Sequence, residues 1–164
     1  MVSLRRLFPS EPSDLLAFKA AFRGAPSYVY ATGGRVPTDS DIEGMMNTLP
    51  SGYTADDMFI YEVSENACPC GCAFLARGYP QPRTAYLVLL LIVESAQGRS
   101  IGQEALRQLE SVARSWGCTS VAAVVDSAND RALKFWLREG FVEARRTRLP
   151  NLVGEAIAIE KNAF

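Results

Sequence analysis

The chain of 164 residues contains no histidine and only three lysines against 14 arginines. Histidine is the side chain that most readily exchanges a proton near neutral pH. Without it, a general base has to be a carboxylate, a tyrosine or ordered water. An excess of one charge is also missing, because 17 basic and 18 acidic residues give a net charge of −1. Since no broad positive field results, the composition argues against nucleic-acid binding.

Long hydrophobic runs are absent as well. No stretch approaches the roughly 18 apolar residues of a membrane span. Arg5 and Arg6 are followed by a polar segment with two prolines rather than by the apolar core of a signal peptide. We therefore expect a cytoplasmic protein that does not enter a membrane.

Cysteine is scarce, and three of the four cysteines lie within residues 68–72. Cys68, Cys70 and Cys72 are too close in sequence for ordinary structural disulfides among themselves, so a secreted disulfide scaffold is excluded. Alternating thiols could ligate a metal, but a tetrahedral zinc site needs four ligands, and no histidine is available. A hairpin with small residues is the favoured interpretation, and a metal or redox sensor is the minor alternative.

Length and composition fit one globular domain over residues 1–164, with 48% hydrophobic and 21% charged residues. Hydrophobic periodicity and turn residues predict regular elements in the first half of the chain. These are a strand over 2–7, a helix over 14–23 capped by Ser13, a helix capped by Thr38 or Ser40 that ends before Pro50, a strand over 58–64, a turn over 65–71 and a strand over 72–77. Residues 24–55 are the least regular part.

The second half has a clearer pattern. Residues 84–93 are apolar without alternation, which is typical of a central strand buried on both faces. The following elements are a helix from Ile101 to Gly117, a strand over 121–125, a helix over 131–139 and two strands over 141–148 and 155–160. The alternation of strands and helices, followed by an antiparallel tail, predicts a mixed sheet.

The segment between the central strand and the helix from Ile101 has the properties of an anion site. Gly98 and Gly102 let the backbone approach a ligand without Cβ interference. The first N–H groups of the helix lack intrahelical partners, and the helix N-terminus carries about half a positive charge. We therefore predict that residues 97–102 hold a phosphate group.

The same segment, Gln97-Gly98-Arg99-Ser100-Ile101-Gly102, together with the run Asn129 to Phe141, resembles the cofactor half of the GNAT-superfamily N-acetyltransferases. The resemblance implies an α/β fold with a mixed, mostly antiparallel sheet, a splayed central pair of parallel strands and flanking helices. It also implies acetyl-CoA as co-substrate and direct transfer of the acetyl group to a primary amine. Two motifs in the right order and spacing are much stronger than one glycine turn alone.

The resemblance assigns cofactor contacts residue by residue. The backbone of the strand end would pair with the pantetheine amides, the turn would cradle the pyrophosphate, and an asparagine and a phenylalanine would border the pantetheine arm. The residues are Leu90, Leu91, Ile92, Gln97, Gly98, Arg99, Ser100, Ile101, Gly102, Asn129 and Phe135. Ser100 stands where the family pattern has its first glycine, and Glu94 stands where a proline is frequent.

Catalytic groups are less clear. Many family members place a tyrosine after the helix phenylalanine to protonate the leaving thiolate, but this chain has Trp136, whose indole has no usable acidity. We expect Trp136 to pack against the cofactor channel or the core. Glu94, next to the turn, and Tyr86, on the central strand, are the candidate catalytic residues on the acceptor side.

Two other functions stay open at this point. Trp136 and the lack of an obvious base would also suit a non-catalytic acyl-CoA-binding sensor or regulatory module. The cysteine group would suit a redox or metal-responsive protein. For the enzyme, the expected partners are a small-molecule amine or a peptide acceptor, and a homodimer is compatible with the resemblance.

Overall fold

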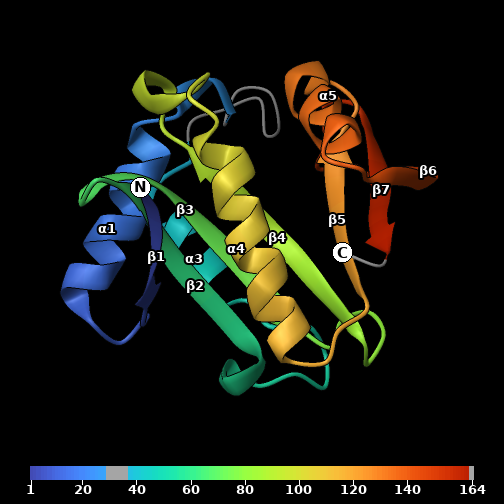
Figure 1. Ribbon diagram of the computed structural model, residues 1–164, viewed down its shortest axis with the longest axis horizontal. Helices are drawn as coiled ribbons and strands as arrows, with labels where there is room; N and C mark the ends of the chain where they lie inside the picture. Colours follow the sequence, from blue (N-terminus) through green and yellow to red (C-terminus); the bar gives the residue numbers. More distant parts are fainter. Residues whose placement is uncertain (29–36, 163–164) are drawn as a thin grey trace.

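One mixed sheet organises the computed structural model, which describes residues 1–28 and 37–162 (Figure 1). In the described part, the strands follow the order β1-β2-β3-β4-β5-β7-β6, and only β4 and β5 run parallel. The strands are β1 (Val2–Leu7), β2 (Met58–Glu65), β3 (Cys68–Arg77), β4 (Thr84–Ile92), β5 (Ser120–Asp126), β6 (Val142–Arg148) and β7 (Glu155–Asn162). The predicted mixed sheet with one central parallel pair is confirmed.

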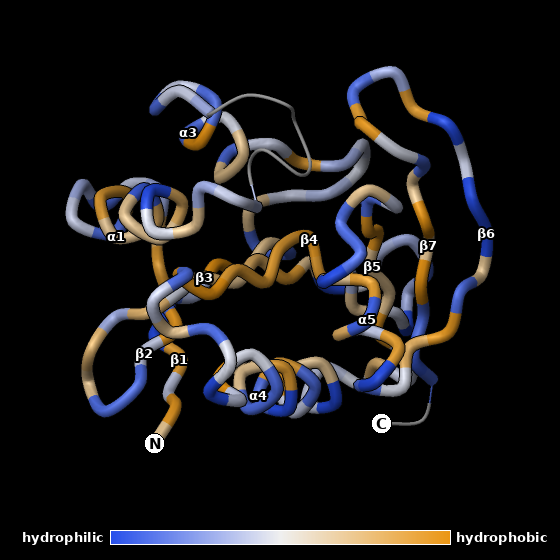
Figure 2. The backbone as a smooth tube through the Cα atoms, turned by 90° about the horizontal axis from the view of Figure 1, so that it is seen from above, coloured by the Kyte–Doolittle hydropathy of each residue, from blue (hydrophilic) through white to orange (hydrophobic). Residues whose placement is uncertain are grey.

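Helices cover both faces of this sheet. Figure 2 shows α1 and α3 on one side and α4 and α5 on the other. Their bounds, with those of two 3-10 turns, are α1 (Pro12–Arg23), α3 (Asp39–Asn47), α4 (Ile101–Ser115), α5 (Asp130–Arg138), η1 (Ala55–Asp57) and η2 (Glu94–Ala96). Two hydrophobic cores result, one under α4 and one under α1 and α3. No helix among residues 1–28 and 37–162 is long and apolar enough to cross a membrane.

Strand β4 contributes to both cores, as its unbroken apolar sequence predicts. Its regular alternation is interrupted once: Leu87 pairs with Leu75 and Leu89 pairs with Phe74, so Val88 is an extra residue. This is a β-bulge, and Val88 is exposed there while its neighbours are buried. Before the bulge, Leu87 packs in the core under α4, and after it Leu89 packs in the core under α1 and α3.

The parallel pairing of β4 with β5 is short. It joins residues 84–87 to residues 120–123, and the hydroxyls of Thr84 and Ser120 are 2.9 Å apart at its start. Beyond Leu87 the two strands diverge, although each continues for several residues. The edge of residues 88–92 that faces β5 therefore has no strand partner in the described structure.

The start of α1 differs from the prediction. Ser13 is not the cap; the cap position is Glu11, and Pro12 occupies the first turn, where its missing N–H is not needed. Asp14 lies in the first turn of α1. Its carboxylate accepts hydrogen bonds from the Arg5 guanidinium at 2.7 Å and from the Phe8 amide at 3.0 Å. These bonds tie α1 to the end of β1.

The cap of α3 confirms one of the two predicted residues. Thr38 is the cap, and its hydroxyl accepts from the Asp41 amide at 3.2 Å. The Asp41 carboxylate accepts in return from the Thr38 amide at 2.7 Å. The pair forms a reciprocal capping box, which Ser40, one residue inside the helix, could not make.

The turn between β2 and β3 is shorter than predicted. Only Asn66 and Ala67 lie between the strands, both with positive φ, so β3 begins at Cys68 and not at Cys72. The sequence does not indicate such a short turn, because the residues around it are small and the Asn-Gly or Gly-Gly pair of common two-residue hairpins is missing.

A second bulge separates the clustered cysteines. Pro69 pairs with Ser64 and Gly71 with Val63, so Cys70 is the extra residue. Cys70 is consequently buried in the core under α4, and Cys72 in the core under α1 and α3. Burial raises the pKa of both thiols. Among the described residues, no three histidine, cysteine or acidic side chains gather as a metal site.

Gly71 in β3 lies close to the backbone of β4. A Cβ atom there would lie 2.2 Å from the Leu91 carbonyl oxygen. We expect Gly71→Ala to lower the free energy of unfolding by about 1–3 kcal/mol, because β3 would have to shift away from β4. Urea denaturation measures this change.

The matched control is Gly44→Ala in α3. A Cβ there would meet nothing within 4 Å, so this variant should gain up to about 1 kcal/mol from helix propensity. A Gly71→Ala protein as stable as the parent chain would contradict the close packing of β3 on β4.

Candidate active site

A cavity of about 600 Å³ lies at the carboxyl ends of β4 and β5, where the two strands diverge. Ligand sites of α/β proteins are found at this edge of parallel strands. Its wall combines the end of β4, the segment leading into α4, the first turns of α5 and two residues that follow α1. The lining residues are Ser27, Tyr28, Leu90, Leu91, Ile92, Ala96, Gln97, Gly98, Ser100, Ile101, Gly102, Gln103, Ala128, Asn129, Asp130, Arg131, Ala132, Phe135 and Trp136.

The segment into α4 presents backbone N–H groups to the cavity. Gly98 and Ser100 both have left-handed backbones, with φ of 77° and 60°. No side chain caps the N-terminus of α4, so its first N–H groups stay available. Alternating left-handed residues before a helix form a concave set of donors, which suits an anion. Ser100 adopts the conformation that a glycine would take more easily, at a cost of about 1–2 kcal/mol.

Gln97 holds this segment on the sheet. Its side-chain amide donates to the Ile92 carbonyl at 2.8 Å. Gln97 also lines the cavity, but its amide already serves as a tether between β4 and the turn. The turn is thereby fixed relative to the strand edge that should take the pantetheine arm.

Arg99 is the one predicted cofactor residue that does not line the cavity. Its guanidinium forms an ion pair with Glu65 at the end of β2. More than half of the Arg99 side chain is exposed, so the pair is a surface contact of small energetic weight. The contribution of Arg99 to an anion site would therefore come from its backbone.

The N-terminus of α5 forms the opposite wall. Asn129 caps this helix, since its Oδ1 accepts from the Ala132 amide at 3.2 Å. In the part of the chain that the structure describes, the Nδ2 group of Asn129 has no acceptor. Asn129 lines the cavity, so the amide can donate to a ligand while the oxygen keeps the cap.

Aromatic side chains close the apolar end of this wall. Trp136 is buried between Phe135 and Phe141, with ring centroids 4.9 and 5.1 Å away. Phe135 also approaches the α4 turn, because a Cβ on Gly102 would lie 3.7 Å from its ring. Trp136 thus packs in the core and borders the cavity, which are the two positions expected for it.

Glu94 lies beside the cavity but does not line it. Its Oε1 accepts from the Ser27 amide at 2.8 Å, and its own amide donates to the Gly24 carbonyl at 2.7 Å. The hydrogen bonds with Ser27 lower the pKa of the Glu94 carboxyl. A lowered pKa makes the carboxylate a weaker base, and the catalytic role of Glu94 stays a prediction.

Tyr86 faces the core under α1 and α3 and is absent from the cavity wall. Its ring packs edge-on against Tyr79, with centroids 5.2 Å apart. Burial, and secondarily the neighbouring Tyr79, raise the pKa of Tyr86, so its phenol is protonated at neutral pH. It can donate or accept a hydrogen bond there, and its catalytic role also stays a prediction.

Sequence reasoning missed two residues of the cavity wall, Ser27 and Tyr28. They follow α1 in the irregular region and carry no motif. Their position depends on Gly24, whose carbonyl accepts a hydrogen bond from the Glu94 amide and whose missing Cβ leaves room for Val93. A contact over about seventy residues of sequence leaves no local signal.

Asp126, at the end of β5, holds two backbone segments together on the α5 side of the site. Its buried carboxylate accepts from the backbone amides of Ala128 at 2.9 Å, Gly154 at 2.9 Å and Val153 at 3.2 Å. It therefore fixes both the turn into α5 and the connection between β6 and β7.

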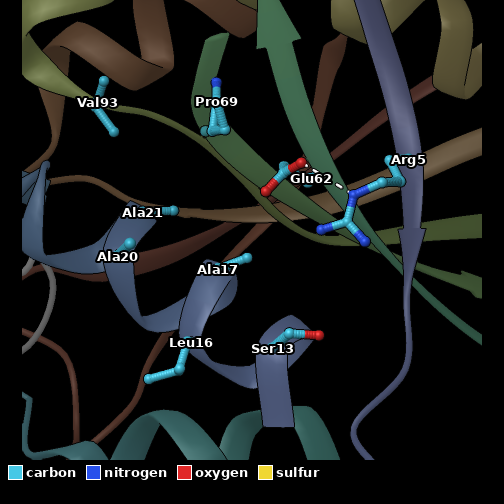
Figure 3. Close-up of a pocket in the computed structure, with 10 residues that line it drawn as sticks. Arg5, Ser13, Leu16, Ala17, Ala20, Ala21, Glu62, Pro69 and Val93 are labelled. Carbon is cyan, nitrogen blue, oxygen red and sulfur yellow. Dashed lines mark hydrogen bonds and ion pairs between the residues drawn. The ribbon is translucent and has the colours of Figure 1, made fainter. Parts of the chain in front are cut away.

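A second hollow, of about 460 Å³, lies between α1 and strands β1 to β3 (Figure 3). Small side chains of α1, among them Ala17 and Ala20, form one wall. Arg5 lies on the other side, paired with Glu62 at 3.1 Å and with Asp14 at 2.7 Å. These two carboxylates compensate the charge of Arg5. None of the predicted site residues lines this hollow.

Comparisons with known proteins identify the family of the chain. The model of the acetyltransferase (GNAT) family matches residues 29–141, more than half of the chain. An acetyltransferase from Thermus thermophilus shares 25% identity, with a TM-score of 0.78 over 99% of this chain and 97% of the other. No curated protein is similar enough to count as a match.

Two solved structures with bound coenzyme A share the fold. The aminoglycoside acetyltransferase AAC(6')-Ib has 20% identity and a TM-score of 0.73, over 99% of this chain and 95% of the other. The PaiA N-acetyltransferase from Thermoplasma acidophilum has 16% identity and a TM-score of 0.68, over 99% of each chain. The chain belongs to the GNAT acetyltransferase family, as an N-acetyltransferase that takes acetyl-CoA as co-substrate and an amine as acceptor.

Proposed function

We propose that this protein transfers the acetyl group of acetyl-CoA directly to a primary amine of a small molecule or a peptide. The observation that supports the proposal is a single cavity in which two helix N-termini meet an unpaired strand edge. A pyrophosphate needs the first feature, and the amide-bearing pantetheine arm needs the second.

In this proposal, the turn from Gln97 to Gly102 and the first turn of α4 bind the pyrophosphate through backbone N–H groups. The pantetheine arm extends the sheet along Leu90 to Ile92, in the place that β5 leaves empty. Asn129 donates from Nδ2 to a pantetheine carbonyl, and Phe135 packs along the arm. The acetyl group then lies deeper along β4, toward the bulge at Val88.

We propose that the acceptor approaches from the α1 and α3 side of the sheet. Helices α4 and α5 cover the other side, as Figure 2 shows. The segment after α1 and the connection between β6 and β7 lie on the open side and would border the entrance. Val124, 45% exposed on β5, supports an uncovered surface there.

The amine must lose a proton to attack the thioester carbonyl carbon. We propose that this proton leaves through water near Glu94, whose lowered pKa keeps it ionised. Tyr86 would orient the acceptor as a hydrogen-bond donor or acceptor. Neither residue has to change its ionisation state during the reaction.

The cytoplasmic location and a homodimer belong to the proposal too. All four cysteines are free thiols, and the cytoplasm keeps thiols reduced. The sensor alternative rested on Trp136 and on the lack of an obvious base, and the packing of Trp136 between two aromatic rings gives this side chain a structural role.

The test of the proposed function is CoA release with a panel of amines, followed across pH. Between about pH 6 and 9, kcat/KM should rise with pH and level off at the pKa of the acceptor amine itself. The reason is that the hydrogen bonds with Ser27 lower the pKa of Glu94 and that burial raises the pKa of Tyr86, so neither group titrates in this range. Acetyl-CoA that binds without turnover on any amine would contradict the proposal, and so would an acidic limb unrelated to the acceptor.

A negative charge added to the first turn of α4 tests the predicted anion site. Gly102→Asp places a carboxylate in the first turn of α4, where acidic side chains favour a helix, and because its Cβ would lie 3.7 Å from Phe135 and Ile92, circular dichroism first checks that the variant keeps its fold. Acetyl-CoA affinity should fall at least tenfold, because the carboxylate repels the pyrophosphate. Isothermal titration calorimetry measures the affinity.

Ser111→Asp is the control. It adds the same charge at an exposed position of α4, nine residues and about 14 Å further along the helix. Its affinity for acetyl-CoA should match that of the parent chain. Equal loss in both variants would indicate a general charge effect and would contradict an anion site at the helix N-terminus.

Asn129→Asp separates capping from ligand binding. Aspartate caps a helix as well as asparagine does, so the melting temperature should stay within experimental error. The Nδ2 donor is lost, and KM for acetyl-CoA should rise about tenfold. Asn129→Ser, which also retains a capping oxygen and lacks Nδ2, should show the same unchanged melting temperature and the same raised KM. Unchanged KM in both variants would remove Asn129 from the cofactor site.

A further inference from the structure

The sheet face opposite α4 and α5 is left without a helix at its β5-β7-β6 end. Residues of β1 to β4 pack under α1 and α3, but within the described ranges no residue of β5, β6 or β7 belongs to that core. Figure 2 shows both helices on the side of the molecule away from β6 and β7. Val124 of β5 is 45% exposed on this face. The uncovered face begins at the gap between β4 and β5, where the proposed function places the acetyl group.

Strand alternation determines which side chains of β7 project from the uncovered face. Ile157 and Ile159 pack in the core under α4. Since successive side chains of a strand point to opposite faces, Ala158 and Glu160 project from the face that α4 and α5 do not cover.

The strand register adds the neighbours of these residues. Glu160 pairs with Ala122 of β5, and Ala122 pairs on its other side with Tyr86 of β4. On the outermost strand, Arg145 of β6 pairs with Ala158. Because directly paired residues share a face of the sheet, Glu160 and Arg145 project from the same face, next to the small side chains of two alanines.

The charges of Glu160 and Arg145 are both uncompensated. In the part of the chain that the structure describes, neither side chain forms a hydrogen bond or an ion pair. They are diagonal neighbours on adjacent strands, which places their Cβ atoms about 7–8 Å apart. By contrast, Arg146 on the other face of β6 is paired with Glu143 at 2.7 Å. A carboxylate and a guanidinium that lie this close without pairing can bind the two opposite charges of one ligand.

The two charges lie at different distances from the gap between β4 and β5. Strand β7 adjoins β5, and β6 adjoins β7 on the far side, with about 4.8 Å between neighbouring strands. Glu160 is therefore one strand away from the gap, and Arg145 is two strands away. A ligand bound to both side chains would direct its cationic end toward the gap and its anionic end away from it.

We propose, on the basis of the proposed function, that the acceptor is a small zwitterionic amine of the amino acid type, with its ammonium group on Glu160 and its carboxylate on Arg145. This orientation brings the nitrogen toward the thioester. The nitrogen forms the new bond to the carbonyl carbon, and the electron pair of the broken C–S bond leaves with the sulfur. Of the two protons that the ammonium group loses, one goes to water and the other ends on the sulfur of CoA.

The first experiment compares acceptors that differ in one charge. CoA release is followed with the twenty proteinogenic L-amino acids, with their carboxamides and with spermidine, all at saturating acetyl-CoA. For the preferred amino acid, kcat/KM should exceed that of its carboxamide at least about tenfold, because only the acid can bind Arg145 through charge-assisted hydrogen bonds. The amine of a carboxamide is the less basic one, so a larger supply of free amine cannot explain a preference for the acid.

Arg145→Gln should remove this preference. The value of kcat/KM should fall at least about tenfold for the amino acid and stay unchanged for its carboxamide. Arg146→Gln is the matched control, since it removes the same charge from the next residue of β6 on the opposite face. An equal loss of the preference in both variants would indicate a general charge effect and would overturn the inference.

Glu160→Gln should act on both acceptors, because both carry an ammonium group. We expect kcat/KM to fall at least about tenfold for the amino acid and for its carboxamide, mainly through a higher KM. Glu155→Gln is the control on the same strand: it pairs with Arg148 and projects toward the α5 side, so it should leave both values unchanged. Unchanged kinetics in Glu160→Gln would contradict the proposed contact.

The outcomes separate the inference from the proposed function. All four variants should bind acetyl-CoA with the affinity of the parent chain in isothermal titration calorimetry and should keep its circular dichroism spectrum. If the parent protein acetylates carboxamides or spermidine as efficiently as amino acids, then the zwitterionic acceptor is wrong and the function stands. If acetyl-CoA binds but no amine is acetylated, then the proposed function fails, and the inference fails with it.

Discussion

The short pairing of β4 with β5 is the constraint on which the rest of the molecule depends. Two parallel strands begin side by side at Thr84 and Ser120 and separate after four residue pairs. An unpaired strand edge inside a protein is costly, because each buried N–H or carbonyl group needs a partner. The bulge at Val88 makes the separation tolerable by turning β4 where it loses its neighbour. The open edge that results is the surface along which a ligand with amide groups can complete the sheet.

The positions of the other functional groups follow from that separation. Parallel strands end at the same edge of a sheet, so the turns after β4 and β5 bring the N-termini of α4 and α5 to one cavity. Gln97 then fixes the first turn to Ile92, and Asp126 fixes the second through three backbone amides. Donors that are held this firmly need no reorganisation when an anionic ligand binds. The cavity is therefore held in shape largely by backbone and by the side-chain hydrogen bonds of Gln97 and Asp126.

Local sequence signals were sufficient for the parts of the fold and of the site that are built locally. The glycines after β4 and the apolar run of β4 each act within one turn or strand, and the strand and helix predicted from them match the described elements. Features that depend on pairing between distant segments could not be predicted. The bulges at Val88 and Cys70 are defined by partner strands, and the second one places cysteines two residues apart in different cores. The contact of Glu94 with Ser27 is of the same kind, since it joins segments 67 residues apart.

The two sides of the sheet tolerate sequence change differently. The α4 and α5 side presents N–H groups that every residue except proline possesses, which is why Ser100 can replace a glycine with a left-handed backbone retained. Structures that share only 16–25% identity with this chain keep the same fold over almost its whole length. The α1 side relies on the side chains of an irregular segment, held to β4 by Glu94. Trp136, where many family members have a tyrosine, is packed between Phe135 and Phe141, so this position contributes to the core on the α5 side of the sheet.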